Sequence, residues 1–450
     1  MKYLTLLFIS LLIVWRGFSI QPSTEKKSLT VSGNGRYLTL NDSPFFWLSD
    51  TGWLMLSKLN REETKKYLDN RVEKGFNVIQ VMVLHSLEAV NASGDSALIH
   101  KNVGTPKDGA YWESLDFAID QAEKKGLYLA LVPVWGTNVK AGRVTEKEAE
   151  VYAEFLAKRY KDKSNIVWLN GGDVRGDGSI QVWKTIGNTL KKYDPNHLVT
   201  YHPFGRTQSS TWFHNESWLD FNMFQSGHRN YAQDTARADL RYGEDNWRYV
   251  LSDYNKSPVK PTLDGEPSYE GIPHGLHDTL QNRWNDNDVR RYAYWSVFSG
   301  ACGFTYGHNS VMQFYTSAPK AGAYGARMPW TEALNSPGAS LLKYLKSLML
   351  DYHFEKLVPD QNILAEPGER YNHLVALRGK NCLLIYTYNG REIRLKSELL
   401  NGDNFEFDWY NPRNGKFVGA VAFKKSEIHE FDPPGEQKDG DDWVLILKQK

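Results

Sequence analysis

Two carboxylates in this sequence follow apolar runs, at places where an enzyme could use them. Residues 166–177 read IVWLNGGDVRGD, so an apolar run ends in two glycines and then Asp173. Residues 263–271 read LDGEPSYEG and place Glu266 two residues after Asp264. Two carboxyl groups can act as acid and base when one holds a proton near neutral pH and the other stays charged. The alternatives are a helix-capping aspartate for Asp173 and a turn or ion-pair residue for Glu266.

The two acids can cooperate only if secondary structure brings them together, and hydrophobic periodicity predicts how. Short apolar runs predict buried strands at residues 45–48, 77–84, 128–134, 166–169, 198–201, 221–224, 261–263 and 303–306. Helical patterns occur at residues 61–74, 111–125, 145–160, 181–193, 290–299 and 337–348. Eight strands alternating with helices predict an α/β fold, a closed (β/α)8 TIM barrel over residues 21–350. An open doubly wound sheet is the alternative, but no GxGxxG follows an early strand.

The predicted barrel gives the two acids a common location. In this architecture chemistry collects at the C-terminal ends of the strands. Asp173 follows the fourth strand and Glu266 the seventh, so both side chains open onto the same mouth. Cleavage of a glycosidic bond with retention needs carboxyl groups about 5 Å apart, whereas about 9 Å favours inversion. We expect the shorter spacing, with an ångström or two of slack because aspartate is short.

The other strand ends carry side chains that could hold a substrate. The candidates are Asp50, Trp53, His85, Trp135, Arg175, His202, Gln225, His228, Tyr306 and His308. The tryptophans could stack on sugar faces or belong to the core, and Asp50 could bind a hydroxyl or cap a turn. The histidines lack metal-site spacing, so we predict no metal and expect hydrogen bonds to sugar hydroxyls or to Glu266. Arg175, like Arg206 and Arg229, could bind an acidic sugar or form a surface ion pair.

Composition and the N-terminus limit the class of protein. The 450 residues include 54 basic and 53 acidic ones, and this balance argues against nucleic-acid binding. Residues 1–20 combine Lys2, an apolar run too short to span a bilayer, and small residues near Gly17. They predict a cleaved signal peptide and a secreted or periplasmic protein, and no later run predicts a transmembrane segment. Cys302 and Cys382 could pair, but two buried free thiols are favoured.

A change of pattern beyond residue 352 predicts a second domain. Strand-like runs occur at residues 374–376, 382–388, 405–410, 416–421 and 443–447. Asn-Gly turn signals begin at residues 389, 401 and 414. Residues 352–450 are therefore predicted to form an all-β sandwich, which we expect to support the barrel rather than to bind the main substrate.

Five stretches of the chain resemble glycoside hydrolase family 140, the apiosidases of clan A. They are FFWLSDTGW (45–53), NVIQVMVL (77–84), IVWLNGGDVRGD (166–177), LDGEPSYEG (263–271) and GACGFTYGHNSV (300–311). The resemblance covers nearly the whole mature chain, including a C-terminal β domain of the collagen-binding type. It implies a retaining hydrolase without cofactor, with Asp173 as general acid/base and Glu266 as nucleophile. The implied substrate is apiose linked to galacturonic acid in the pectin rhamnogalacturonan II.

One departure and two alternatives accompany this resemblance. Many clan A enzymes present Asn-Glu after the fourth strand, where this chain has Gly172-Asp173. Because aspartate is shorter, either the acid must lie closer to the bond or the substrate must lie deeper in the mouth. The two glycines are expected to let backbone and sugar approach closely. The alternatives are another clan A glycosidase acting on a different plant glycan, and a non-catalytic carbohydrate- or matrix-binding protein. Asp177 and Glu270 are the next acids to test, and the sequence leaves the oligomeric state open.

Overall fold

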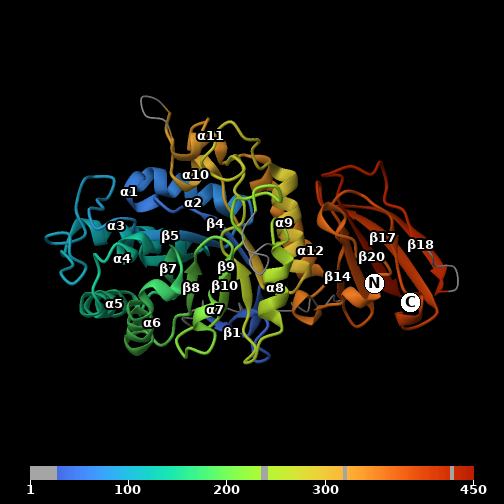
Figure 1. Ribbon diagram of the computed structural model, residues 1–450, viewed down its shortest axis with the longest axis horizontal. Helices are drawn as coiled ribbons and strands as arrows, with labels where there is room; N and C mark the ends of the chain where they lie inside the picture. Colours follow the sequence, from blue (N-terminus) through green and yellow to red (C-terminus); the bar gives the residue numbers. More distant parts are fainter. Residues whose placement is uncertain (1–27, 235–241, 318–321, 426–429) are drawn as a thin grey trace, which may run out of the picture.

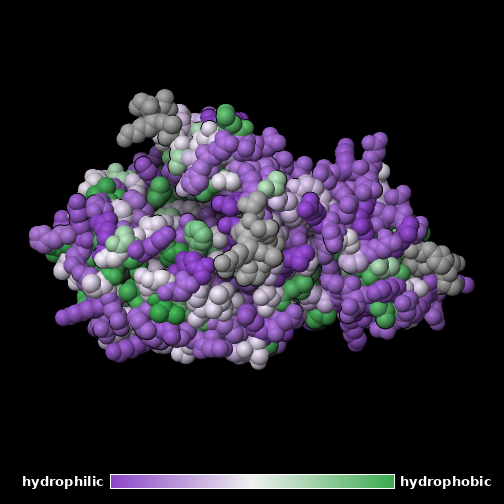
Figure 2. All heavy atoms as spheres, in the orientation of Figure 1, coloured by the Kyte–Doolittle hydropathy of each residue, from purple (hydrophilic) through white to green (hydrophobic). Residues whose placement is uncertain are grey.

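The computed structural model of the chain describes residues 28–234, 242–317, 322–425 and 430–450. The predicted signal peptide at residues 1–20 lies outside the described residues. The chain forms a barrel and a smaller β domain, with two long helices between them (Figure 1). On the face shown in Figure 2, hydrophilic residues dominate and hydrophobic atoms lie in small groups among them. No helix of the described residues is both long and apolar enough to cross a bilayer.

Eight parallel strands form the barrel, as the sequence predicts. They are β4 (Trp47–Thr51), β5 (Val78–Leu84), β6 (Tyr128–Val134), β7 (Ile166–Val174), β8 (Val199–Pro203), β10 (Asn222–Gln225), β11 (Thr262–Asp264) and β12 (Gly303–Tyr306). They pair in the order β8-β7-β6-β5-β4-β12-β11-β10. The ends of this sheet meet where Thr200 Oγ1 donates to Phe221 O at 2.6 Å. A short strand, β9 (Thr207–Gln208), pairs antiparallel with β10.

Helices lie between successive barrel strands, and three more, α10 to α12, follow the last strand. They are α1 (Met55–Lys58), α2 (Arg61–Glu73), α3 (Ala110–Lys124), α4 (Gly136–Lys140), α5 (Glu146–Tyr160), α6 (Ile180–Tyr193), α7 (Ser210–Phe213), α8 (Asn246–Tyr254), α9 (Asp286–Phe298), α10 (Asn309–Met312), α11 (Trp330–Ala333) and α12 (Pro337–Asp351). The predicted capping box between Thr145 and Glu148 is present at the start of α5. Ser336 is the N-cap of α12, but its side chain makes no capping bond, and Glu270 accepts from Gly338 N at 3.1 Å instead.

A small antiparallel sheet closes the bottom of the barrel, opposite the mouth. It consists of β1 (Leu29–Val31), β2 (Leu38–Leu40) and β3 (Ser43–Phe45). Leu29 and Leu38 belong to the same buried cluster as Val78 and Phe221, which lie at the beginnings of barrel strands. Within the described part of the chain, this sheet covers the end of the barrel at which the strands begin.

The C-terminal domain consists of two antiparallel sheets, which confirms the predicted all-β sandwich. The larger sheet has the order β13-β14-β15-β20-β17-β18 and the smaller pairs β16 with β19. The strands are β13 (Val358–Pro359), β14 (Val375–Arg378), β15 (Cys382–Thr387), β16 (Ile393–Arg394), β17 (Asn404–Asn411), β18 (Lys416–Lys424), β19 (Glu430–Phe431) and β20 (Trp443–Gln449). Ile393 and Phe431 of the small sheet share a buried cluster with Ile385 and Leu445 of the large one.

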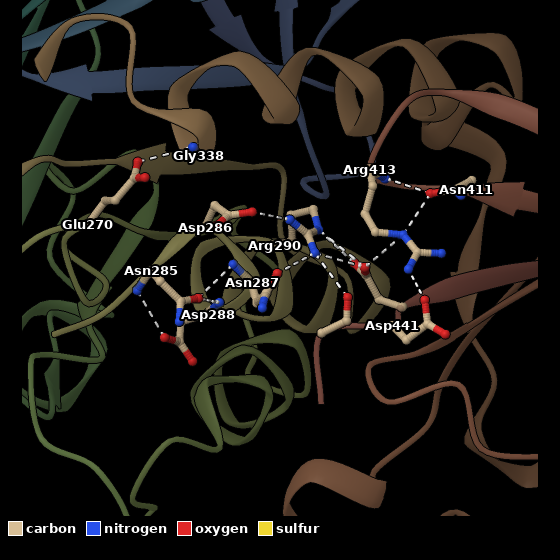
Figure 3. Close-up of polar contacts among 12 residues, drawn as sticks. Glu270, Asn285, Asp286, Asn287, Asp288, Arg290, Gly338, Asn411, Arg413 and Asp441 are labelled. Atoms are coloured by element: carbon tan, nitrogen blue, oxygen red, sulfur yellow. Dashed lines mark hydrogen bonds and ion pairs between the residues drawn. The ribbon is translucent and has the colours of Figure 1, made fainter. Parts of the chain in front are cut away.

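The two domains meet through buried aromatic and charged side chains. Tyr294 of α9 stacks on Tyr386 of β15 with ring centroids 4.6 Å apart. Arg290 of α9, labelled in Figure 3, reaches across to the β domain. Its Nε lies 2.9 Å from Asp442 Oδ2. Both cysteines are free. Cys302 is buried in the barrel, and Cys382 is half-buried on β15. This interface makes the barrel and the β domain parts of one packed structure.

Candidate active site

The fourth barrel strand does not stop at Leu169, as the sequence suggested. It continues to Val174 through a bulge between Gly171 and Val174. Gly171, Gly172 and Asp173 all have positive φ, at 91°, 115° and 52°. This conformation is readily adopted by glycine and tolerated by aspartate.

The two glycines make room for protein rather than for sugar, which corrects the expectation from the sequence. A Cβ atom on Gly171 would lie 2.6 Å from His202 O. A Cβ atom on Gly172 would lie 2.7 Å from Cε3 of Trp135. The bulge therefore lets the backbone pass close to its neighbours and directs Asp173 to the mouth of the barrel.

Glu266 follows β11 and is held by two histidines. His202 Nε2 lies 3.1 Å from Glu266 Oε2, and His228 Nε2 lies 3.4 Å from Oε1. The backbone N–H of Asp173 donates to His202 Nδ1 at 3.3 Å. Because Nδ1 of His202 accepts this hydrogen bond, the one ring proton of the neutral imidazole must be on Nε2. Nε2 is the atom that faces the carboxylate of Glu266. His202 thus connects the bulge that carries Asp173 to the carboxylate of Glu266.

The environment separates the pKa values of the two acids. Burial, followed by the negative charge of Glu266, raises the pKa of Asp173 to about 6. Burial alone would raise the pKa of Glu266, but the hydrogen bonds that His202 and His228 offer to its carboxylate oppose burial, and the pKa is lowered. Glu266 is only 8% exposed, so these contacts act with little screening by solvent. At mildly acidic pH, the carboxyl of Asp173 can therefore hold a proton while that of Glu266 is ionised.

Both acids line one cavity of about 430 Å³ at the mouth of the barrel. Four of the predicted substrate contacts line it too, namely Trp53, Trp135, Gln225 and His228. The indole rings of Trp53 and Trp135 lie 5.5 Å apart, which gives the cavity an aromatic wall. His202 lies behind Glu266 and is buried, so we place it in contact with the acid rather than with a substrate.

Asp50 is not at the cavity, although it is the penultimate residue of the first barrel strand, β4. Its Oδ2 accepts from Tyr67 Oη at 2.7 Å and from Arg71 Nη1 at 3.2 Å. All three side chains are buried between the sheet and α2. We therefore withdraw the predicted substrate contact and assign Asp50 to a structural ion pair.

Three further candidates also lie outside the cavity lining. Tyr306 Oη donates to Glu270 Oε2 at 2.6 Å in a buried contact. His308 caps α10 by accepting from Ser310 N at 3.0 Å, and burial lowers its pKa to about 3. His85 is half-buried, and its Nδ1 lies 3.0 Å from Ser57 Oγ. These side chains serve the structure around the site.

Arg175 and the two alternative acids are also accounted for by local contacts. Arg175 pairs with Asp177 at 2.7 Å, and both are about half-exposed beside a neighbouring hollow of about 170 Å³. Glu270 is buried against Tyr306 and Gly338, where burial raises its pKa to about 7. Neither Asp177 nor Glu270 lines the cavity that Asp173 and Glu266 share.

The sequence analysis missed two tyrosines of the site. Tyr269 Oη accepts from Trp53 Nε1 at 2.9 Å and fixes that ring. It lies in the same LDGEPSYEG stretch as Glu266, so its proximity could have been inferred. Tyr324 lines the cavity from a 3-10 turn, Ala323–Gly325, which no sequence pattern connects to the barrel mouth. Among the described residues, no group of three or more His, Cys, Asp and Glu could hold a metal ion.

The fold and this site define a glycoside hydrolase with a barrel of the clan A type. Two solved structures support that class. One, titled "Glycoside hydrolase", is 44% identical with a TM-score of 0.88, covering 94% of this chain and 97% of its own. A glycoside hydrolase family 5 structure from Bacteroides vulgatus is 43% identical with a TM-score of 0.89, covering 94% of each chain. An endo-1,4-beta-D-mannanase from Thermotoga petrophila shares the fold, at 17% identity and a TM-score of 0.51, over 68% of this chain and 100% of its own.

The sequence models of two families match the chain. The family described as "Apiosidase-like, catalytic domain" matches residues 32–356. The chain belongs to this apiosidase-like family. Residues 358–448 match the family described as "Putative collagen-binding domain of a collagenase". A search of curated proteins found no match.

Proposed function

We propose that this protein is an apiosidase of glycoside hydrolase family 140, which cleaves apiose from galacturonic acid in the pectin rhamnogalacturonan II. The observation that carries the proposal is the pair of carboxyls in one cavity, one with a raised and one with a lowered pKa. The match of residues 32–356 to the apiosidase-like family supports the choice of sugar.

The proposed reaction is a double displacement. A Glu266 oxygen attacks the anomeric carbon while the bond to the leaving oxygen breaks, and that oxygen takes the proton of Asp173. The resulting Asp173 carboxylate then takes a proton from water, whose oxygen attacks the anomeric carbon and releases Glu266. The anomeric configuration is inverted twice and so retained. Trp53 and Trp135 would stack on the sugar.

Basic side chains near the cavity support an acidic leaving group. Arg229 lines the cavity and is exposed, and no ion pair of Arg229 is formed within the described part of the chain. Arg206 also lines the cavity, but Asp234 pairs with it. We propose that Arg229 meets the carboxylate of galacturonic acid, because a guanidinium group matches a carboxylate in a two-bond fork.

We further propose that the protein acts after export. Residues 1–20 have the composition of a cleaved signal peptide, and a pectic polysaccharide is an extracellular substrate. Expression with the natural N-terminus, followed by mass measurement of the mature protein, tests this. An uncleaved N-terminus on protein retained in the cytoplasm would contradict it.

The substrate is tested by incubation with a panel of pectic and hemicellulosic polysaccharides, followed by identification of the released sugars. Apiose released from rhamnogalacturonan II fragments is the expected product, and the Glu266→Gln variant is the control. Release of another sugar would assign a different glycosidase activity. If no glycan of the panel is cleaved, the proposal fails and carbohydrate binding becomes the better hypothesis.

The roles of the two acids are tested with azide and an activated aryl glycoside. Asp173→Ala should keep its first step, because such a leaving group departs without a proton, and should accumulate the glycosyl-enzyme. Azide needs no general base, so it should restore turnover and yield a glycosyl azide of retained configuration. Glu266→Gln should lose turnover on every substrate. Azide rescue of the Glu266 variant with a retained product would reverse the assignment.

A further inference from the structure

His228 reaches Glu266 from a loop and depends on that loop for its position. The loop joins β10 to α8 and includes the described residues 226–234. Within the described structure, Nδ1 of His228 has no hydrogen-bond partner. Its backbone O accepts from Gly275 N at 2.7 Å and from Trp284 Nε1 at 3.3 Å. The orientation of the ring toward Glu266 is therefore set by how this backbone is held.

The same loop is fixed three residues further on by a buried carboxylate. Tyr231 N donates to Glu244 Oε1 at 3.1 Å. Glu244 is 1% exposed, and Arg291 Nη2 donates to its Oε2 at 2.5 Å. Buried charges need partners of this kind, because desolvation opposes ionisation. Glu244 thus connects the loop of His228 to α9.

A third partner of Glu244 comes from the C-terminal domain. Tyr371 Oη lies 3.0 Å from Glu244 Oε1 and 3.1 Å from Oε2, so its hydroxyl can donate to the carboxylate. The ring of Tyr371 contacts the ring of Tyr231 at 5.6 Å, and Arg291 lies over the Tyr371 ring at 4.7 Å. Next to it, the Arg370 guanidinium lies 5.1 Å from the Tyr231 ring. Two side chains of the β domain therefore hold the loop that carries His228.

We propose that Tyr371 is a positioning residue, through which the C-terminal domain fixes the loop at residues 226–234 and keeps His228 against Glu266. This inference rests on the proposed role of Glu266 as nucleophile. It gives the β domain a task in the reaction that requires no binding of collagen or of substrate by that domain.

The chain offers a matched control for Tyr371→Phe. Tyr386 also belongs to the β domain and also lies against the barrel. Its Oη donates to a buried carboxylate, Asp442 Oδ2, at 3.2 Å. Asp442 pairs with Arg290 rather than with any residue of the His228 loop (Figure 3 shows the Arg290 contacts). Tyr386→Phe therefore removes an equivalent hydroxyl at the same domain interface, without touching the loop.

The first measurement is hydrogen–deuterium exchange of the free, full-length protein by mass spectrometry. Tyr371→Phe should speed exchange in peptides spanning residues 226–234 by roughly tenfold, the effect of losing one hydrogen bond to a charged group. Tyr386→Phe should leave these peptides unchanged. Equal behaviour of the two variants in this loop would overturn the proposal.

The second measurement is the pH profile of kcat/KM with 4-nitrophenyl apioside. The groups that face Glu266 are Asp173, His202, His228, Tyr269 and Tyr324. If the His228 contact loosens while the others stay, the pKa of Glu266 rises. The acidic limb should then move up by roughly half a unit to one unit in Tyr371→Phe.

Each outcome of the kinetic test is decisive. An acidic limb that moves in Tyr371→Phe and stays in Tyr386→Phe supports the positioning role, and a limb that moves in neither variant overturns it. If the wild-type protein does not turn over the apioside, the proposed substrate fails while the exchange measurement still decides this inference. Should Tyr371→Phe fail to fold, Arg370→Gln removes the neighbouring contact of the β domain with Tyr231 of the same loop, from an exposed side chain, and should also speed exchange there.

Discussion

Replacement of Asp173 by asparagine should make the protein more stable while nearly abolishing its activity. The pKa of Asp173 is raised to about 6, mainly by burial and then by the charge of Glu266. At neutral pH the folded protein therefore carries an unfavourable carboxylate, which an amide of the same shape removes. Asparagine also tolerates the positive φ of 52° at this position, so the bulge should persist. The variant lacks a proton donor and should lose roughly 10²–10⁴-fold in rate on unactivated substrates.

The gain in stability should depend on pH in a definite direction. The folded state binds the Asp173 proton more tightly than the unfolded state, so its stability falls as pH rises from the ordinary pKa of 3.8 to about 6. Two pKa units correspond to about 3 kcal/mol. Water in the cavity screens part of this, so we expect a gain of about 1–2 kcal/mol in Asp173→Asn at pH 8. Near pH 3.5 the gain should vanish.

Thermal unfolding of wild type and variant at the two pH values tests this reasoning. With about 2.1 cal/mol/K per residue over roughly 325 barrel residues, 1 kcal/mol shifts Tm by about 1.5 °C. The expected rise at pH 8 is therefore about 1.5–3 °C. Asp177→Asn is the control, because Arg175 lowers the pKa of that half-exposed carboxyl and removal of the charge should not stabilise. A pH-independent Tm difference, or a loss of stability at pH 8, would refute the electrostatic account of Asp173.

Three other predictions follow from the same geometry. The kcat/KM of the wild-type protein should be highest below about pH 6 and fall as Asp173 loses its proton, and an activated aryl glycoside should show a weaker basic limb. Gly172→Ala should lower Tm and should reduce the rate of turnover at least about tenfold, because its Cβ would meet Trp135. Gly178→Ala is the control: a Cβ there has no atom within 4 Å, so Tm and turnover should both stay unchanged. Deletion of residues 352–450 should reduce soluble yield and Tm by exposing the packed interface, and a truncated barrel that folds normally and loses only polysaccharide binding would contradict this.

The sequence predicted the barrel well because its strands are continuous apolar runs, which have few alternative interpretations. It also predicted that Asp173 and Glu266 share a cavity, since the ends of parallel strands must meet at one mouth. It did not predict the length of β7, because glycines that end a strand and glycines that form a bulge look the same in a sequence. The extra residues of the bulge determine where Asp173 points.

Side-chain direction explains why some predicted contacts fell outside the cavity. Ser49, Gln80 and Thr305 bond to one another inside the barrel, with 2.8 Å between the two hydroxyls. Asp50 and Tyr306 are their sequence neighbours and are paired across β4 and β12, so both point outward to the helices. Strand alternation could have excluded these two residues from the site, whereas Tyr324 could not have been found by any periodicity.

The bulge in β7 and the ionisation of Glu266 are parts of one arrangement. Positive φ at Gly171 and Gly172 turns the Asp173 N–H toward Nδ1 of His202. That contact requires the proton on Nε2, which is the atom that faces Glu266. The same residues therefore bring Asp173 to the cavity and favour the charged form of the Glu266 carboxylate. The Gly-Gly-Asp bulge therefore bears on both acids, because it carries Asp173 and also contacts the histidine that faces Glu266.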